Sequence, residues 1–133
     1  MQLSFSFRNA ELVSMGFQNL QAEIPQIGRL QIYRTAQSIV RRLKVYPSRI
    51  TAYIRTYVFR AGWNIDRYDL GYRISNRVPY GHYVVGDAFG AGQAWMHQGS
   101  WETFRNVADE EAEKLPEAIQ DELTLAIRRN NLA

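Results

Sequence analysis

The sequence contains no cysteine. Disulfide bonds and thiolate metal sites are therefore excluded, which suits a protein made in the cytoplasm. No apolar run approaches the ~20 residues that a membrane-spanning helix needs. The first residues, MQLSFSFRNAE, lack a basic start followed by a continuous apolar stretch. The sequence therefore predicts neither a secretory signal nor a membrane contact.

Acidic residues are missing from a long internal stretch. None occurs between Glu23 and Asp66, where eight basic residues lie: Arg29, Arg34, Arg41, Arg42, Lys44, Arg49, Arg55 and Arg60. The charge balance is +7 for residues 1–101 and −4 for residues 102–133. Three interpretations remain open: nucleic-acid contact, contact between the acidic end of one copy and the basic part of a neighbour, or folding of the acidic end onto its own basic part.

Length and composition predict one globular domain over residues 1–133, because the chain is 46% hydrophobic and 13% aromatic. The expected layout is an N-terminal strand or arm and helices over 1–45, a sheet and loop over 50–101, and C-terminal helices over 102–131. This order indicates an α+β fold, in which a small antiparallel β-sheet packs against long amphipathic helices and a C-terminal helix.

The first 45 residues begin with alternating apolar and polar side chains over 2–8, typical of a half-buried strand or an interaction arm. Asn9 is a suitable N-cap for a helix over about 10–22, whose apolar side is Leu12, Met15 or Gly16, and Leu20. Pro25 predicts the first turn of a second helix reaching about Lys44. Its apolar stripe consists of Ile32, Ala36, Ile39, Val40 and Leu43. Its candidate basic face consists of Arg34, Arg41, Arg42 and Lys44.

The middle of the chain has the pattern of β-structure. Tyr46-Pro47 ends the preceding helix, and residues 50–59 are expected to be extended because β-branched and aromatic residues dominate. A hairpin follows, in which Trp63 starts the first strand, residues 68–71 supply the turn, and the second strand carries Tyr72 and Ile74. We expect Trp63 to lie in the core.

The C-terminal part has a helical pattern. A helix is expected over about 102–114 with Ser100 as its N-cap, and Pro116 either kinks this helix or opens a new one. The last segment has an apolar stripe consisting of Leu115, Ile119, Leu123, Ala126 and Ile127. This spacing predicts an amphipathic helix.

The stretch 76–101 is the most unusual part of the sequence. It contains five aromatic residues, two histidines, five glycines, one proline and a single acid in 26 positions. It is too rich in turn-forming residues for one strand and too aromatic for a flexible linker. We therefore expect an ordered loop that contacts another molecule.

Catalytic and metal-binding patterns are weak. His82, Asp87 and His97 could form a metal site, but their spacing matches no metal motif, and His97 is also explained as a loop residue beside Trp101. Asp66 and Asp69 fit turn chemistry. No Gly-x-Ser-x-Gly elbow is present, and no strand, glycine-rich turn and helix with a lysine surrounds residues 90–92. The sequence therefore predicts a protein that is not an enzyme, with no cofactor, metal or catalytic site.

A basic nucleic-acid-binding module is the alternative function. Aromatic and basic residues alternate at Tyr53, Arg55, Tyr57 and Arg60, as on surfaces that stack single-stranded bases. The same residue types are enriched in protein interfaces. Composition does not separate these two functions.

Three stretches together resemble a family of neck proteins of tailed phages and prophages, the siphophage tail-completion or head–tail connector proteins. Residues 53–56 (YIRT) followed by Trp63 are similar to the family pattern YxRTGxL…W. Residues 76–86 (NRVPYGHYVVG) resemble NxVPYAxYVxG, and residues 93–101 (QAWMHQGSW) resemble QAxxHxGxW. The chain departs from the pattern at Tyr57, where the family commonly has Gly, and at Phe59, where it commonly has Leu.

The resemblance implies a structural role in the virion neck, with assembly in the host cytoplasm. Such proteins form homo-oligomeric rings between the portal or adaptor and the tail proteins, where non-specific contact with packaged DNA is also conceivable. The candidate interface residues are Tyr80, Tyr83, Trp95, His97, Trp101 and Arg55. A ring needs two different complementary surfaces on each copy, and the division of charge would supply them.

Overall fold

The computed structural model describes residues 10–45, 58–69 and 71–132. Tertiary contacts divide the chain into two compact units. The first, here called the helix-pair unit, comprises the described residues 10–32 and 114–132, and the second, the α+β unit, comprises Tyr33–Glu113. The described chain is mainly helical with one two-stranded antiparallel sheet, which confirms the α+β class. Within the described ranges, no helix combines the length and apolar character needed to cross a membrane.

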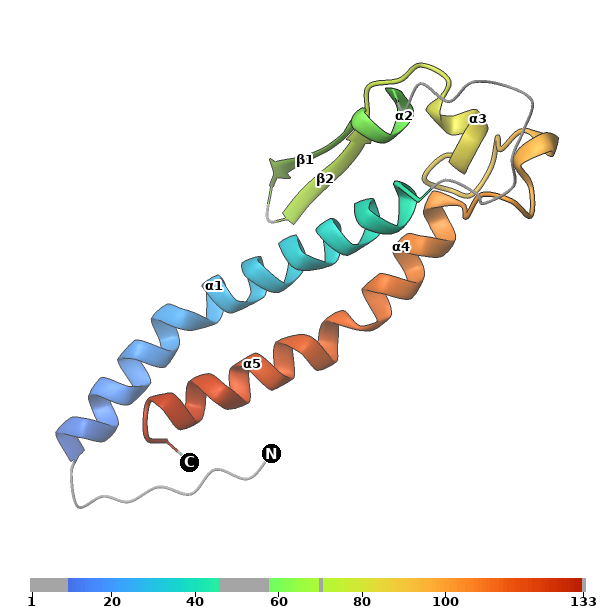
Figure 1. Cartoon of the computed structure of the whole chain (residues 1–133). Coiled ribbons are helices and arrows are strands. Elements are labelled where there is room, and N and C mark those ends of the chain that lie inside the picture. Colours follow the sequence, from blue (N-terminus) through green and yellow to red (C-terminus); the bar gives the residue numbers. More distant parts are fainter. Residues whose placement is uncertain (1–9, 46–57, 70, 133) are drawn as a thin grey trace. The chain divides into compact units, whose positions relative to one another are not determined.

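Helix α1 (Ala10–Leu43) is continuous and contributes to both units (Figure 1). The prediction of two separate helices around Pro25 is therefore wrong. A proline inside a helix removes the hydrogen bond to the carbonyl four residues earlier and costs ~3 kcal/mol or more. Pro25 and Gln21, whose carbonyl loses that partner, are both exposed, so water can satisfy the carbonyl. The predicted strand or arm and the Asn9 cap lie outside the described residues.

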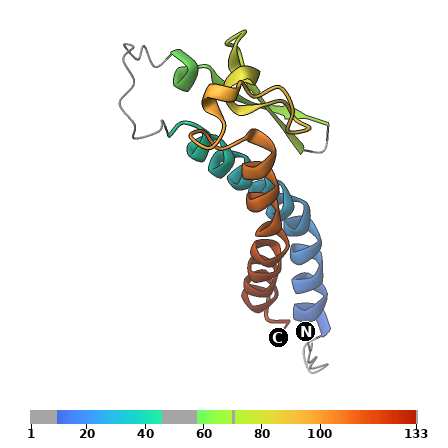
Figure 2. The ribbon, with the colours of Figure 1, turned by 90° about the vertical axis from the view of Figure 1, so that its right-hand side faces the viewer.

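The helix-pair unit consists of the first part of α1 and helix α5 (Leu115–Arg129), which run side by side and antiparallel in both views (Figures 1 and 2). Pro116 lies in the first turn of α5, so it opens a new helix after α4 ends at Glu113. Arg129 donates to Glu23 at 2.6 Å across the pair. Buried residues are few: Gly16, Gln31, Ala126, Ile127 and Leu132.

The apolar side predicted for residues 10–22 is only partly correct. Gly16 faces the end of α5, where an added Cβ would lie 2.5 Å from the carbonyl oxygen of Asn130. Leu20 is half-buried, but Leu12 and Met15 are exposed. Glycine rather than a large side chain therefore forms the contact, because the two helices approach closely there.

The α+β unit contains the end of α1 followed by a set of short elements. These are α2 (Val58–Ala61), β1 (Trp63–Tyr68), β2 (Gly71–Asn76), α3 (Gly81–Val85), the 3₁₀ helix η2 (Trp95–His97) and α4 (Phe104–Glu113). The predicted hairpin is confirmed, with Trp63 opposite Asn76 and Ile65 opposite Ile74. Asp69 has a φ of 51° in its turn, a conformation that aspartate tolerates better than most residues.

One core cluster holds the α+β unit together. Its buried members come from α1, from the residues next to the hairpin, from α3 and from α4: Ile39, Leu43, Phe59, Val78, Val84, Val85 and Val107. Trp63 is half-buried at the edge of this cluster, 5.6 Å from the Phe59 ring and 6.3 Å from the Phe104 ring between centroids. Four of the five residues in the predicted α1 stripe are buried, which confirms that stripe.

Three local predictions in this unit need correction. Val58 and Phe59 were expected to be extended but lie in α2, because burial of the Phe59 side chain overrides local strand propensity; residues 46–57 lie outside the described part. The N-cap of α4 is Thr103, not Ser100, since the Thr103 hydroxyl accepts from the Asn106 amide at 3.2 Å. The expected loop over 76–101 contains α3 and η2.

Candidate docking surface

The segment 76–101 is held by side chains that bond to the backbone. Asn76 donates from Nδ2 to the Phe59 carbonyl and accepts at Oδ1 from the Val78 amide, both at 2.9 Å. Gln93 donates from Nε2 to the carbonyls of Val84, at 2.8 Å, and Trp101, at 3.2 Å. Each amide side chain therefore ties two points of the chain together, which gives an irregular segment a defined shape.

A turn closed by Asp87 lies within this segment. The Asp87 carboxylate accepts from the amides of Phe89, at 2.8 Å, and Ala91, at 3.0 Å. Gly86 and Gly90 adopt φ values of 78° and 84°, which favour glycine. The Ala91 and Phe89 amides, with a smaller contribution from His82, lower the pKa of the Asp87 carboxyl below its ordinary value. Asp87 is therefore charged at neutral pH, the form that accepts from both amides.

The segment leaves large apolar side chains in solvent. Among the predicted interface residues, Tyr80 is 47% exposed, Tyr83 54% and Trp95 80%. Phe89, at the Asp87 turn, is 86% exposed, and Met96 is exposed beside Trp95. The sequence interpretation missed Phe89 and Met96. Phe89 could have been found from its place between Asp87 and Gly90, since a large side chain at the tip of a tight turn has little chance of reaching a core.

Two other predicted interface residues face the protein itself. Trp101 is half-buried and packs edge-to-face on Phe59, with 5.7 Å between ring centroids. His97 contacts the Trp101 ring edge-to-face at 6.3 Å, and partial burial lowers the pKa of its imidazole. Trp101 and His97 therefore pack against the protein's own side chains and expose less area to a partner than Tyr80, Tyr83 and Trp95 do. Arg55 lies outside the described residues.

The candidate basic face is smaller than predicted, because Arg42 is occupied within the chain. Its guanidinium contacts three carboxylates of the acidic C-terminal part, Glu102 at 2.5 Å, Glu110 at 2.7 Å and Glu111 at 3.2 Å. Glu102, followed by Glu110, raises the pKa of Arg42. The interpretation that the acidic end folds onto its own basic part is thus confirmed at Arg42.

The rest of the candidate basic face is less engaged. Arg34 and Arg41 are exposed and Lys44 is half-buried. Within the described part of the chain, Arg34 and Arg41 make no ion pair. Two cations therefore remain available to an acidic partner.

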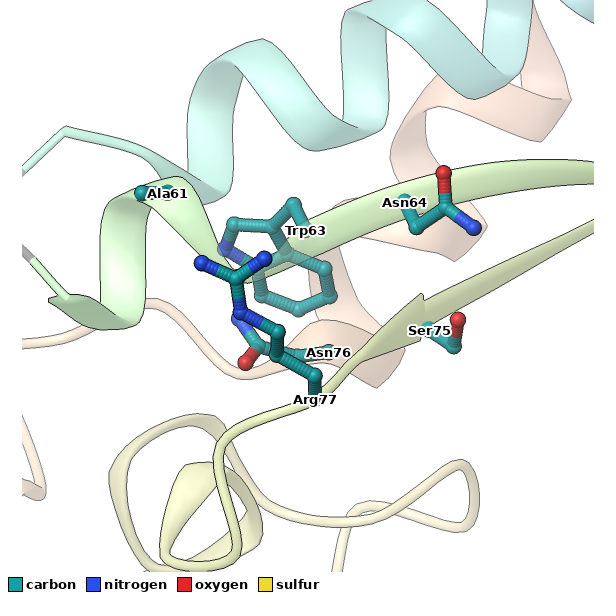
Figure 3. A pocket seen from close by; sticks show the side chains of 7 residues that line it. Ala61, Trp63, Asn64, Ser75, Asn76 and Arg77 are labelled. Atoms are coloured by element: carbon teal, nitrogen blue, oxygen red, sulfur yellow. The ribbon is translucent and has the colours of Figure 1, made fainter.

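Two shallow hollows lie beside the hairpin. One, of about 450 Å³, is shown in Figure 3, with Trp63, Asn64 and Arg77 among its lining residues and neither an acid nor a histidine in its wall. The other, of about 420 Å³, includes His82 and Asp87 but not His97. Across the residues described, no three His, Cys, Asp or Glu side chains are grouped to hold a metal ion. The geometry therefore gives little support to the His-Asp-His site considered from the sequence.

Comparisons of the chain with protein-family models, curated proteins and solved structures found no match. The functional argument therefore depends on the residues and their arrangement. A hydrogen-bonded segment with exposed Tyr, Trp and Phe side chains has the composition of a protein-binding surface. Its exposed rings, Tyr80, Tyr83, Phe89 and Trp95, are not among the residues that line either hollow, unlike the side chains of a concave ligand site.

Proposed function

We propose that this chain is a structural virion protein of a tailed phage, a ring-forming head–tail connector or tail-completion component without enzymatic activity. The single observation that carries the proposal is the exposed aromatic set, Tyr80, Tyr83, Phe89 and Trp95, on a hydrogen-bonded framework. Exposing such side chains in water is unfavourable unless a partner covers them.

The sequence resemblance supports the same conclusion through contacts between two of its stretches. Gln93, the first residue of the QAxxHxGxW-like stretch, donates to the carbonyl of Val84 in the NxVPYAxYVxG-like stretch. The neighbouring Ala94 amide donates to the Tyr83 carbonyl at 2.7 Å. The two stretches thus form one piece of structure, as expected if the pattern specifies a shared shape.

A neck component must bind its neighbours firmly and in one orientation. Tyr and Trp suit that task, because each covers a large area with few rotatable bonds and can place a polar atom at the rim. The framework residues Asn76, Gln93 and Asp87 fix the segment before binding, which reduces the entropy lost on association. The proposed partners are the portal or adaptor and tail proteins of the same particle.

The direct test is co-assembly with those particle proteins, followed by native mass spectrometry and electron microscopy. Wild-type protein should join the complex, while Tyr83→Ala combined with Trp95→Ala should weaken binding by about thirtyfold or more, as expected for losing about 2 kcal/mol at an interface centre. Tyr68→Ala is the matched control, because Tyr68 is 60% exposed outside the segment. Equal binding by all three proteins would contradict the proposed role of the segment.

A further inference from the structure

The end of the β-hairpin carries a cation without a partner. Arg77 follows β2 and is exposed, and its backbone amide donates to the Gly62 carbonyl at 3.0 Å. Across residues 10–45, 58–69 and 71–132, no carboxylate pairs with the Arg77 guanidinium. Arg73 on β2 differs, because its guanidinium lies over the Tyr68 ring, 5.1 Å from the centroid. Arg77 can therefore bind a group from outside the chain.

A hydrogen-bond donor without an acceptor belongs to the same hollow. Both Arg77 and Trp63 line the first hollow beside the hairpin, of about 450 Å³. The Trp63 Nε1 atom is buried and finds no acceptor within the described part of the chain. An indole N–H can only donate, and a buried donor without an acceptor destabilises the folded protein. Figure 3 shows the Arg77 side chain extending toward the Trp63 indole, whose nitrogen lies on the side of the guanidinium.

The charges around the two hollows favour a negatively charged ligand. The second hollow, of about 420 Å³, shares four lining residues with the first, Trp63 and Arg77 among them, so the two adjoin. Among the described residues that line either hollow, the one acid is Asp87. Its carboxylate already accepts from two backbone amides of its own turn. A negatively charged group at Arg77 therefore meets little opposing charge.

A carboxylate matches this donor set better than a phosphate does. The carboxylate is planar with two acceptor oxygens, and the guanidinium fork of arginine binds that shape well. Phosphate sites usually combine several cations or a row of free backbone amides. The described lining residues of the hollows include a single arginine and no lysine, together with the apolar side chains Ile74, Val85 and Phe104. These walls suit a carboxylate that arrives with apolar neighbours.

A partner protein is the source of the carboxylate that the surroundings favour. The hollows are shallow, and one arginine holds a free small carboxylate weakly, because such a ligand brings few other contacts. Two exposed rings border the second hollow: Tyr83 contacts the wall residue His82 at 4.0 Å between ring centroids, and Phe89 follows the wall residue Ala88. Arginine beside exposed aromatic rings is the composition of an interface centre. A protein that covers these rings can bring an acidic side chain to Arg77.

We infer that Arg77 and the Trp63 indole form a carboxylate site, which receives an aspartate or glutamate side chain of the protein that docks on the segment 76–101. The carboxylate accepts from the Arg77 guanidinium and from the Trp63 N–H, while the exposed rings cover apolar area around it. This inference rests on the proposed function for the existence of that partner. It adds the chemistry by which the partner is recognised.

Nuclear magnetic resonance of the Trp63 indole tests the site without any particle protein. The chain has three tryptophans, and the Trp63 N–H signal is the one that Trp63→Phe removes. At neutral pH, sodium acetate should move this signal downfield and to saturation, because a carboxylate oxygen accepts from the N–H. Sodium chloride at the same ionic strength should not. Arg77→Gln should weaken the acetate response at least about fivefold, since the charge-assisted hydrogen bonds are lost.

Two further variants separate the Arg77 fork from charge alone. Arg73→Gln is the matched control, because it removes an exposed arginine of the same hairpin that lines neither hollow. It should change acetate binding by less than about twofold, because salt screens the more distant charge. Arg77→Lys should bind acetate more weakly than wild type and more tightly than Arg77→Gln, since it keeps the charge without the fork. Thermal unfolding of each variant confirms that it is folded.

Three results of the titration would overturn the inference. One is a Trp63 signal that does not respond to acetate, and another is an equal response in wild type and Arg77→Gln. The third is a stronger response to inorganic phosphate than to acetate, which would assign the hollow to phosphate. Loss of salt-sensitive DNA binding in Arg77→Gln would then identify nucleic acid as the source of that phosphate.

Co-assembly with portal, adaptor or tail proteins tests the source of the carboxylate. Arg77→Gln should weaken that binding by about tenfold or more, and Arg73→Gln by less than about twofold. Equal binding by wild type and Arg77→Gln would overturn the inference and leave the neck role standing. If no particle protein binds the wild type while acetate still moves the Trp63 signal, the carboxylate site stands and the neck role is wrong.

Discussion

The segment 76–101 and the helix-pair unit both place large apolar side chains in solvent, but they do so on different supports. The segment is fixed by polar side chains that bond to its backbone, and Trp101 and Phe59 anchor it to a core. The helix pair has a close contact at Gly16 and few buried apolar side chains. A preformed surface loses little conformational entropy when it binds a partner. The helix pair, with few buried side chains, draws less of its stability from a core of its own.

Removing the buried Phe59 ring under the segment is expected to have the largest effect on this comparison. Phe59 is 4% exposed and contacts Trp63 and Trp101 edge-to-face. Phe59→Ala should lower the free energy of unfolding by about 3–5 kcal/mol, through lost burial and a residual cavity. Denaturant unfolding measures it, with Phe89→Ala as the exposed control, expected within about 0.5 kcal/mol of wild type. A small loss in Phe59→Ala would mean that the segment does not rest on this core.

The Arg42 cluster gives the next largest expected effect. Arg42→Met leaves Glu111, which is 8% exposed, beside two other carboxylates without their shared cation. Breaking a fully buried pair costs about 3–5 kcal/mol, and partial exposure reduces our expectation to about 1–3 kcal/mol. The adjacent Arg41→Met is the matched control, because exposed Arg41 has no ion pair among the described residues, and it should change stability by less than about 0.5 kcal/mol. Equal effects at both positions would contradict a structural role for the cluster.

Two glycines of α1, Gly16 and Gly28, test how closely the two helices of the helix-pair unit approach each other. Gly16→Ala should destabilise by about 1–2 kcal/mol, because its Cβ would lie 2.5 Å from the Asn130 carbonyl oxygen and the helices must separate. Gly28→Ala meets nothing within 4 Å, so it should stabilise by about 0.5–1 kcal/mol through helix propensity alone. The two variants share the same chemical change, so thermal unfolding of both isolates the helix contact. Stabilisation by both would show that the pair does not approach closely.

Patterns with a local physical cause were predictable from the sequence. The hairpin follows from alternation at Trp63 and Ile65 and from turn residues, and the α1 stripe follows from helical spacing. Pro25 was misjudged because its cost depends on whether the orphaned carbonyl is solvated, which spacing does not reveal. Helix α3 was missed because the glycines and the proline of the segment 76–101 favour a loop, whereas burial of Val84 and Val85 in the core stabilises a short helix.

The candidate docking surface was predictable in composition but not in orientation. Aromatic richness correctly indicated exposed Tyr80, Tyr83 and Trp95, yet the same signal covered Trp101, which packs against the core. Which ring turns inward depends on contacts with Phe59, far away in the sequence. The exposure of Leu12 and Met15 could not be predicted from the sequence either. An apolar stripe on a helix can pack against a partner or against the protein's own core, and the spacing is the same in both cases.

The smallest expected effect concerns Asp87. Its titration tests whether the carboxylate holds the turn in the segment 76–101. The folded-state pKa of Asp87 lies below its ordinary value because the Ala91 and Phe89 amides favour the charged form. Its contribution is therefore fully present above the unfolded-state pKa of about 3.9 and is lost as the pH falls from there through the lower folded-state pKa. Protection of the Phe89 and Ala91 amides from exchange, measured by nuclear magnetic resonance and corrected for the intrinsic pH dependence, should fall over that range.

Two substitutions separate charge from hydrogen bonding at this turn. Asp87→Asn keeps an accepting oxygen but removes the charge, so the exchange rates should be modestly raised at neutral pH and should lose their acid-range acceleration beyond the intrinsic pH dependence of exchange. Asp87→Ala removes the acceptor and should raise both rates further, with Asp69→Asn as a control outside the segment. Unchanged exchange at Phe89 and Ala91 in Asp87→Ala would mean that the glycines and the backbone hydrogen bonds of Asp87 with Ala91 and Gly90 shape the turn without the carboxylate. The contrast between a hydrogen-bonded segment and a helix pair with few buried side chains would then no longer depend on the Asp87 carboxylate, because the backbone bonds of the turn remain without it.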